Sequence, residues 1–352
     1  MPFNRLADMD LLPELAWHPR VDLGLIRTSL DPLERLGRRL GISLFAKRDD
    51  VQPLAMGGNK TRQLEFYLGL AAKQECDTVL ITGAVQSNFV RSCAAAARKL
   101  GWHAVVQLED RVPNDDPVYA SSGNVLLDQM LGAEIHYFSE GENEAAADAN
   151  LDRMAEDCVR RGKNPYVVHL GIDSPPVGGL GYAYAAAETW RQFEELGVFP
   201  DHVVIPSGSG LTHGGFLVGA RAIGWKVPVH GICVRRSAEL QSQRIARRSG
   251  ELNAMIENKA TLQPEDILVD DVTLAPGYGR INEAVSAAIT HAAHDEALLL
   301  DPVYSGRTMA GLISLVERGV IEQGSTVAFI HTGGLPAIFA YQNELKPITD
   351  AG

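Results

Sequence analysis

The chain has 352 residues, of which 45% are hydrophobic and 22% are charged, and its 32 basic and 44 acidic side chains give a net charge of -12. This length predicts two domains, and the composition is that of a folded globular protein, which excludes disordered and fibrous classes. The acidic balance argues against non-specific binding to nucleic acid or to an anionic membrane, so we expect neither as a partner.

The first 27 residues carry acidic side chains among scattered prolines, whereas a secretory signal needs a basic start and an uninterrupted apolar run. No apolar run approaches the roughly 18 residues of a transmembrane helix. The cysteines are widely spaced, with no pairing typical of a zinc site or a disulfide framework: Cys76, Cys93, Cys158 and Cys233. We therefore expect free thiols and a cytoplasmic location.

Strands and helices alternate through the first half of the chain. After an amphipathic segment over 32–40, strands are expected over 43–48, 78–82, 103–108, 134–138 and 166–169. Helices are expected from Lys60 onward and over 88–100, 124–131 and 140–161. This alternation predicts crossover connections and parallel sheets.

Lys60 directly follows Gly57, Gly58 and Asn59 and precedes an amphipathic helix pattern. Glycine lets a backbone approach a ligand closely, and the partial positive charge at a helix start disfavours protonation of a lysine there. Lys60 is therefore a candidate amine nucleophile. The alternative is an ordinary turn into a surface helix.

The second half continues in the same style, with helices expected over 183–196, up to about residue 256, and over 308–316, and with Gly277–Gly279 opening another helix. Strands are expected over 202–206, 229–234 and 326–331. The glycine-rich loop 207–215 joins a strand to a helix, where backbone N–H groups and the helix dipole favour an anion such as a phosphate monoester. A tight turn without a ligand is the alternative.

A similar strand-to-helix turn places Gln86, Ser87 and Asn88 at a helix start, where they could hold a carboxylate or simply cap the helix. Tyr278 and Tyr304 lie in short glycine-bounded loops, where a tyrosine can act as acid, base or clamp or can be a partly buried ring.

Two further groups receive no functional role. His291 and His294 are close to metal-ligand spacing, but no third ligand accompanies them, so we expect no metal. A basic cluster is interpreted as a solvated helix face or a subunit contact rather than a ligand site; it consists of Arg235, Arg236, Arg244, Arg247 and Arg248.

Several of these stretches occur together in one order: 57–62, 86–88, 178–182, 207–212, 277–279, 301–304 and 331–334. Together they resemble the D-cysteine desulfhydrase and 1-aminocyclopropane-1-carboxylate deaminase family of pyridoxal-phosphate enzymes, which has the tryptophan synthase β-subunit fold, fold type II. The resemblance runs from about Ile42 to Tyr341. With the alternating pattern, it implies an α/β fold of two domains, each an open, mostly parallel sheet flanked by helices, with the cofactor in the cleft between them.

The resemblance also implies a domain division and an assembly. Residues 1–58 and 164–352 would form a large cofactor-binding domain, and residues 59–163 a small domain. The chain would act on a small amino acid as a homodimer, with pyridoxal 5'-phosphate as cofactor.

Roles for individual residues follow from the same resemblance. Lys60 would hold the cofactor aldehyde as a Schiff base, Asn88 would face its phenolic oxygen, and Thr332 would meet its ring nitrogen. The other cofactor-binding residues would be Asn59, Ser207, Gly208, Ser209, Gly210, Leu211, Thr212 and Gly333. Gln86, Ser87 and Asn88 would bind the substrate carboxylate, with Tyr278 and Tyr304 on the substrate side. The catalytic residues would be Lys60, Ser87, Tyr278 and Tyr304.

The position after Tyr304 suggests the reaction. The deaminase branch has an acidic residue there, whereas this chain has Ser305. A hydroxyl partner such as Thr332 or Ser305 leaves the ring nitrogen largely neutral, and this weaker electron sink favours loss of a β-substituent over long-lived carbanion chemistry. We therefore expect a carbon-sulfur lyase that converts D-cysteine to pyruvate, sulfide and ammonia, with the cyclopropane deaminase or a non-catalytic binding protein as alternatives.

Three departures from the family concern the substrate and the cofactor phosphate. Gln63 replaces a lysine that contacts the phosphate, and Arg62 is a candidate for supplying the missing charge. Phe89 stands where a histidine is common, and residues 28–33 replace an N-terminal Thr-Pro-Leu. The departures make L-cysteate sulfo-lyase activity a further alternative.

Overall fold

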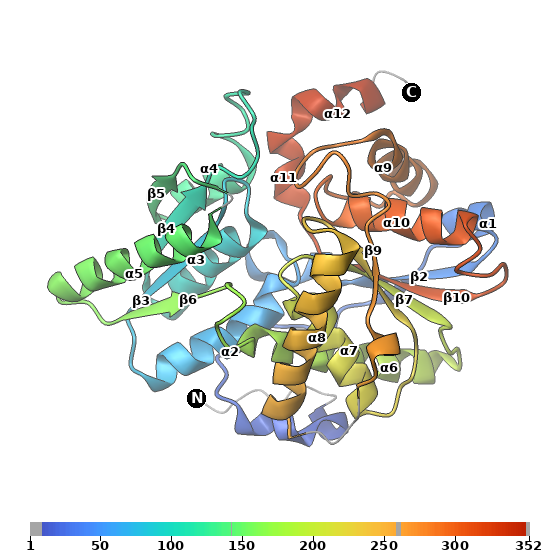
Figure 1. Cartoon of the computed structure of the whole chain (residues 1–352), viewed down its shortest axis with the longest axis horizontal. Coiled ribbons are helices and arrows are strands. Elements are labelled where there is room, and N and C mark those ends of the chain that lie inside the picture. Colours follow the sequence, from blue (N-terminus) through green and yellow to red (C-terminus); the bar gives the residue numbers. More distant parts are fainter. Residues whose placement is uncertain (1–8, 142, 258–261, 350–352) are drawn as a thin grey trace.

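The structure is a computed structural model that describes residues 9–141, 143–257 and 262–349. Residues 1–8, 258–261 and 350–352 of the predicted large domain, and residue 142 of the predicted small domain, lie outside the described residues. Figure 1 shows two groups of strands side by side, each with its own helices.

The six-stranded sheet has the order β1-β2-β10-β7-β8-β9 and is parallel except for β1, which pairs antiparallel with β2. Its strands are β1 Leu30–Pro32, β2 Ser43–Arg48, β7 His202–Ser207, β8 Val229–Cys233, β9 Leu268–Asp270 and β10 Thr326–His331. On β7, Val204 packs into a cluster on one face, and Val203 and Ile205 pack into a cluster on the other. Both faces are therefore covered, as parallel sheets require.

The four-stranded sheet has the order β5-β4-β3-β6 and is entirely parallel. Its strands are β3 Thr78–Ala84, β4 His103–Glu109, β5 Glu134–Phe138 and β6 Pro165–Val168. β3 is buried along its whole length, because it has neighbours on both edges and helices on both faces. The two sheets confirm the predicted α/β fold with open, mostly parallel sheets, whereas the exact domain division stays a prediction.

Helices cover both sheets (Figure 1). They are α1 Glu34–Leu40, α2 Lys60–Lys73, α3 Asn88–Leu100, α4 Gly123–Met130, α5 Glu144–Arg160, α6 Leu180–Leu196, α7 Leu211–Ala222, α8 Ala238–Met255, α9 Glu283–Glu296, α10 Ser305–Glu317, α11 Leu335–Ala340 and α12 Gln342–Thr349. Local sequence explains their ends: α3 begins where Ser87 Oγ accepts the Val90 N–H at 3.2 Å and stops at Gly101, whose φ is 77°.

The structure differs from the predicted elements in a few places. β1 and β9 were not expected, since three residues are too few to show an alternating pattern. Gly277–Gly279 does not open a helix; the chain remains irregular until Asn282 caps α9. Within the described residues, no helix is long and apolar enough to cross a membrane.

Candidate active site

A pocket lies at the carboxyl ends of strands from both sheets. Its lining residues follow β3 (Ser87 and Asn88), β4 (Arg111), β7 (208–210 and Thr212), β8 (Arg235 and Arg236) and β10 (Thr332). In open α/β sheets, loops at the carboxyl ends of the strands build the ligand site. The pocket is therefore a candidate active site built jointly by the two sheets.

Lys60 lines this pocket as the first residue of α2. The turn before it is fixed between two strand ends, because Gly58 N donates to Asp49 O and Asn59 N donates to Thr332 O, both at 3.0 Å. Gly57 has a φ of 71°, and a Cβ there would lie 1.9 Å from Asp50 O. Only glycine fits this turn, which explains the glycine that precedes the lysine.

The Lys60 amine has an apolar neighbour and a weak hydrogen-bond partner. Its Nζ lies 4.7 Å from the centre of the Phe89 ring and 3.4 Å from Gln63 Oε1. Burial lowers the pKa of Lys60 to about 8. The partial positive charge at the helix start was the expected cause of a lowered lysine pKa, whereas desolvation of the amine is the main cause in the structure. A substantial neutral fraction near neutral pH makes this amine a competent nucleophile.

The loop after β7 carries the features of a phosphate site. Gly208, Ser209, Gly210 and Thr212 line the pocket at the start of α7, a helix of 12 residues. Backbone N–H groups at a helix start bind anions. Ser207 and Leu211 do not line the pocket: Ser207 Oγ lies 3.0 Å from His213 Nδ1 and accepts from Gln241 Nε2 at 2.8 Å, while Leu211 is buried in the core.

Gln63 connects the lysine helix to this loop. Gln63 Nε2 donates to Thr212 Oγ1 at 2.8 Å, and Asn59 Nδ2 donates to the same oxygen at 2.9 Å. Gln63, which departs from the family pattern, therefore holds the loop after β7 through hydrogen bonds instead of contributing a charge.

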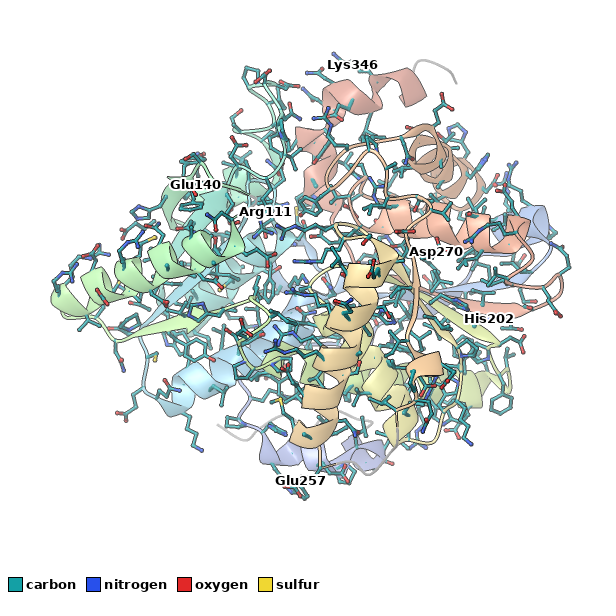
Figure 2. The ribbon with its side chains drawn as sticks, viewed as in Figure 1. Arg111, Glu140, His202, Glu257, Asp270 and Lys346 are labelled. Carbon is teal, nitrogen blue, oxygen red and sulfur yellow. The ribbon has the colours of Figure 1, made fainter. Side chains whose placement is uncertain are left out.

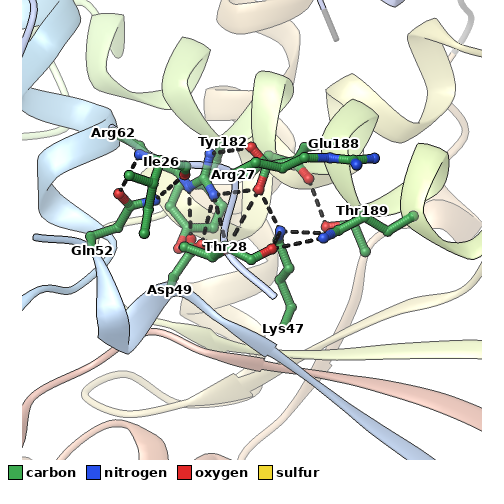
Figure 3. Close-up of polar contacts among 12 residues, drawn as sticks. Ile26, Arg27, Thr28, Lys47, Asp49, Gln52, Arg62, Tyr182, Glu188 and Thr189 are labelled. Carbon is green, nitrogen blue, oxygen red and sulfur yellow. Dashed lines mark hydrogen bonds and ion pairs between the residues drawn. The ribbon is translucent and has the colours of Figure 1, made fainter. Parts of the chain in front are cut away.

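Arg62 does not supply the missing charge, because its guanidinium is buried away from the pocket. Figure 3 shows it between Asp49 and Glu188, with Nη2 at 2.8 Å from a carboxylate oxygen of each. Burial opposes ionisation of both carboxyls, but the charges of Arg62 and Lys47, together with the hydrogen bonds from Arg62, outweigh burial and lower their pKa values. This cluster fixes the first turn of α2, and hence Lys60, against β2 and α6.

On the opposite wall, Ser87 and Asn88 line the pocket at the start of α3. Ser87 Oγ both faces the pocket and caps the helix, and Asn88 Oδ1 accepts from Asn124 Nδ2 at 2.9 Å. Gln86 is not brought to the site: its Nε2 donates to Tyr119 O at 2.6 Å, and its Oε1 accepts from Asn124 N at 2.9 Å. Its amide holds the start of α4 instead.

Tyr278 and Tyr304 meet within the pocket, with their hydroxyl oxygens 3.0 Å apart and their ring centres 6.1 Å apart. Burial, followed by the neighbouring Tyr278, raises the pKa of Tyr304, so this hydroxyl is neutral and can donate a proton. The structure therefore pairs two tyrosines that lie 26 residues apart in the sequence.

The two hydroxyls considered for the ring nitrogen have different surroundings. Thr332 lines the pocket, whereas Ser305 is buried and its Oγ donates to Asp301 Oδ1 at 2.6 Å. Of the two hydroxyl-bearing residues, Thr332 is therefore the one that lines the pocket. Gly333, with a φ of 90°, does not line the pocket but packs against Gly58, where a Cβ would lie 2.7 Å from the Gly58 Cα.

Charged residues that the sequence did not indicate also line the pocket. They are Glu109, Arg111, Glu144, Asp148, Arg235, Arg236 and Arg244. The interpretation of Arg235, Arg236 and Arg244 as a solvated face was wrong; Arg247 alone in that cluster is largely exposed, and Arg248 is buried. The sequence did contain a sign that these arginines could line a ligand site, since Arg111, Arg235 and Arg236 lie within three residues after the carboxyl ends of predicted strands.

The arrangement fits pyridoxal phosphate on the evidence of its donor set. A desolvated amine, a glycine-rich helix start and a threonine lie around one pocket and match an aldehyde, a phosphate and a ring nitrogen, respectively. Among the described residues, no group of three or more His, Cys, Asp or Glu side chains is placed to hold a metal ion.

Comparison with known proteins gives a consistent picture. Residues 21–333 match the family model described as pyridoxal-phosphate dependent enzyme. The chain is 39% identical to the D-cysteine desulfhydrase of Klebsiella pneumoniae, over 95% of this chain and 99% of that protein. It is 38% identical to the 1-aminocyclopropane-1-carboxylate deaminase of Burkholderia vietnamiensis, over 92% of this chain and 96% of that protein.

Solved structures agree at the level of the fold. A crystal structure described as an ACC deaminase homologue superposes with a TM-score of 0.84 at 32% identity, covering 96% of this chain and 98% of that one. O-ureido-L-serine synthase gives a TM-score of 0.64 at 18% identity, covering 94% of each chain, and supports the fold alone.

Proposed function

We propose that this chain, which belongs to the family of pyridoxal-phosphate-dependent enzymes, catalyses β-elimination from a small amino acid. The reaction would convert D-cysteine to pyruvate, sulfide and ammonia. The observation that carries the proposal is the convergence of Lys60, the loop after β7, Thr332 and the tyrosine pair on one pocket. Relatives named D-cysteine desulfhydrase, similar over nearly their whole length, support the choice of reaction.

The residues that would hold the cofactor come from both sheets. Lys60 would hold it covalently through Nζ, the N–H groups of the loop after β7 would bind its phosphate, and Thr332 would lie at its ring nitrogen. Asn59 supports the loop through Thr212, and Asn88 faces the pocket from the opposite wall. When bound, the cofactor supplies an electron-withdrawing ring that stabilises negative charge on the α-carbon of the amino acid.

The chain's own groups would then move the protons. The Lys60 amine, whose pKa is lowered to about 8, takes the proton from the α-carbon of the substrate. The Ser87 hydroxyl and the N–H groups at the start of α3 hold the substrate carboxylate. Tyr304, kept neutral by burial and hydrogen-bonded to Tyr278, protonates the departing sulfur.

A cyclopropane deaminase is the second candidate, because relatives and a well-superposed structure carry that name. The two reactions give different keto acids, 2-oxobutyrate from the cyclopropane amino acid and pyruvate from D-cysteine. The Ser305 hydroxyl, bound to Asp301, leaves the hydroxyl of Thr332 rather than a carboxylate for the ring nitrogen, which favours β-elimination.

The experiment that tests the proposal incubates the purified protein with D-cysteine and measures pyruvate, sulfide and the visible absorbance of the bound cofactor. Lys60→Ala should abolish the visible band and pyruvate release. Lys73→Ala, an exposed position at the far end of the same helix, should leave both unchanged. A Lys60→Ala protein with an unchanged spectrum, or a wild type that gives no keto acid from either amino acid, would contradict the proposal.

The cytoplasmic location, the homodimer and the domain division at residues 58/59 and 163/164 belong to the same proposal. Four buried, free cysteines support a reducing compartment. Light scattering of the purified protein tests the assembly, and a monomer at enzymatic concentration would contradict the homodimer.

A further inference from the structure

Four arginines surround one carboxylate at the side of the pocket. Glu144, the first residue of α5, pairs through Oε1 with Arg235 and, at 2.6 Å, with Arg236 Nη2. Burial opposes ionisation of Glu144, yet the charges of Arg236, Arg235, Arg244 and Arg111 hold its pKa below the usual range. The Glu144 carboxylate is therefore ionised in a partly desolvated pocket, because the positive charges of four guanidinium groups stabilise it.

The cluster joins the two halves of the molecule. Glu144 comes from a helix packed on the four-stranded sheet, Arg111 follows β4 of that sheet, and Arg235 and Arg236 follow β8 of the six-stranded sheet. Figure 2 shows Arg111 where the two halves meet. A ligand bound between the halves would encounter these guanidinium groups.

Other contacts divide the arginines by role. Arg244 Nε donates to Ser209 O at 2.8 Å and Nη2 donates to Leu170 O at 3.1 Å, so Arg244 supports the loop proposed to bind the cofactor phosphate. Burial and the charge of Arg236 lower the pKa of Arg244 to about 10. Arg244 is therefore a positioning residue for that loop.

Arg236 also contacts this loop, and it lies, like Arg111, near the tyrosine pair. Arg236 Nη1 donates to Gly208 O at 3.3 Å, and a Cβ on Gly208 would lie 3.7 Å from the Tyr304 ring. Arg111 interacts electrostatically with both Tyr278 and Tyr304. Since the tyrosines are proposed to act on the leaving group, these two arginines lie on the side of the substrate that carries that group.

We propose that Arg111, Arg235 and Arg236 form a subsite for an anionic group on the β-carbon of the amino acid, and that Glu144 occupies this subsite until such a substrate displaces it. This proposal rests on the proposed β-elimination and specifies its substrate class: amino acids whose β-carbon carries a sulfonate or a phosphate that leaves as sulfite or phosphate. Arginine suits this task because its planar fork matches such oxyanions.

The other acidic residues of the pocket already have partners. Glu109 Oε1 accepts from Arg111 Nη2 at 2.7 Å, and Asp148 Oδ1 lies 3.7 Å from His169 Nδ1. Glu144 is the carboxylate that bridges to the arginines after β8, so it is the group that an incoming anion would replace.

Cysteate is the test substrate for this class. In the elimination of cysteate, the bond between the β-carbon and sulfur breaks, and its electron pair leaves with the sulfur as sulfite. The proton removed from the α-carbon combines with this sulfite to give hydrogen sulfite. The remaining aminoacrylate takes up one water and gives pyruvate and ammonium. No oxidant or reductant is needed, because the sulfur keeps its electron pair.

The experiment compares cysteate, as both enantiomers, with β-chloroalanine, whose β-substituent carries no charge before it leaves. In the holoenzyme, Arg236→Gln should lower kcat/KM for cysteate roughly 10- to 100-fold through KM, as expected for a lost charged hydrogen bond, and should leave β-chloroalanine nearly unchanged. Glu144→Gln should act in the opposite direction and tighten cysteate binding. Arg247→Gln is the matched control, since Arg247 lies on α8 and pairs with Asp173 and Glu251 outside the pocket.

Cofactor absorbance and circular dichroism of each variant show whether it binds cofactor and folds. Equal losses with both substrates would overturn the proposal, because the arginine would then hold the common α-carboxylate. Loss of cofactor from Arg236→Gln would also overturn it. If the wild type releases no pyruvate from cysteate, β-chloroalanine or D-cysteine, the proposed function fails, and calorimetry with cysteate then tests the subsite alone. Opposite shifts in affinity for Arg236→Gln and Glu144→Gln support the subsite, and no binding of cysteate overturns it.

Discussion

Replacing Arg62 with methionine should destabilise the protein strongly, although Arg62 lies outside the pocket. Its Nε and Nη2 donate to the two oxygens of Asp49 at 2.9 and 2.8 Å, and Nη2 also donates to Glu188 Oε1 at 2.8 Å. All three side chains are almost completely buried. Removing one partner of a buried ion pair costs about 3–5 kcal/mol when the remaining charge is left without compensation. Here that charge is Asp49, because Glu188 keeps its buried ion pair with Lys47.

The sign of the pH dependence makes this prediction specific. In the wild type the pKa values of Asp49 and Glu188 are lowered, so their stabilising contribution is present above the unfolded-state pKa of about 4 and is lost as pH falls through the folded values. Without Arg62, burial should raise the pKa of Asp49 above that of the unfolded chain, whereas Glu188 keeps Lys47 as its ion-pair partner. The variant should then gain stability as pH falls toward the raised pKa of Asp49, and the difference from wild type should shrink.

The assay is urea unfolding of both proteins, saturated with cofactor and followed by tryptophan fluorescence at a series of pH values. Other buried carboxyls with raised pKa values, Glu65 and Asp128, titrate in both proteins, so they largely cancel from the difference. The exposed pair of Arg247 and Glu251 serves as a control, where Arg247→Gln should cost less than about 1 kcal/mol. If Arg62→Met lowered the free energy of unfolding by less than about 1 kcal/mol, or if its difference from wild type did not change with pH, the buried ion pair would not have the stabilising role described.

Three further predictions concern the pocket. Incorporation of cofactor into the apoprotein should speed up as pH rises, with a midpoint at about 8, because only the neutral Lys60 amine reacts; a pH-independent rate would contradict the lowered pKa. Gln63→Leu should weaken cofactor binding roughly 5- to 10-fold in an absorbance titration, as expected for one lost hydrogen bond to Thr212, and unchanged affinity would argue against that role. Tyr304→Phe should lower kcat for D-cysteine by roughly 100-fold or more with little change in KM, whereas Tyr137→Phe, at an exposed position, should not.

Local sequence pattern carried much of the fold and the identity of the central lysine. The glycines before Lys60 made it a candidate, and the structure shows that the turn requires Gly57, but the cofactor role of Lys60 followed from the resemblance of several stretches in one order. The strands of both sheets could be expected from their apolar runs, since parallel strands are buried on both faces. Short edge strands such as β1 give no such signal.

The pocket wall was harder to predict, because it depends on which side chain each loop turns inward. Gln86 and Ser87 are adjacent, yet the Gln86 amide is held by the start of α4 while Ser87 faces the pocket. Arg236 and Arg247 are both basic residues of an acidic protein, and only the fold places one in the pocket and the other in solvent. Contacts between distant segments decide these outcomes, and composition does not record them.

The central claim is that Lys60 is the residue that holds the cofactor, and chemical trapping tests it most directly. Borohydride reduction of the holoenzyme fixes the cofactor to the amine that carries it, and mass spectrometry of the tryptic digest locates the modified residue. We expect a modified peptide spanning residues 49–62, in which Lys60 is the one lysine. Cofactor fixed to any other lysine, or a holoenzyme in which none is fixed, would contradict it.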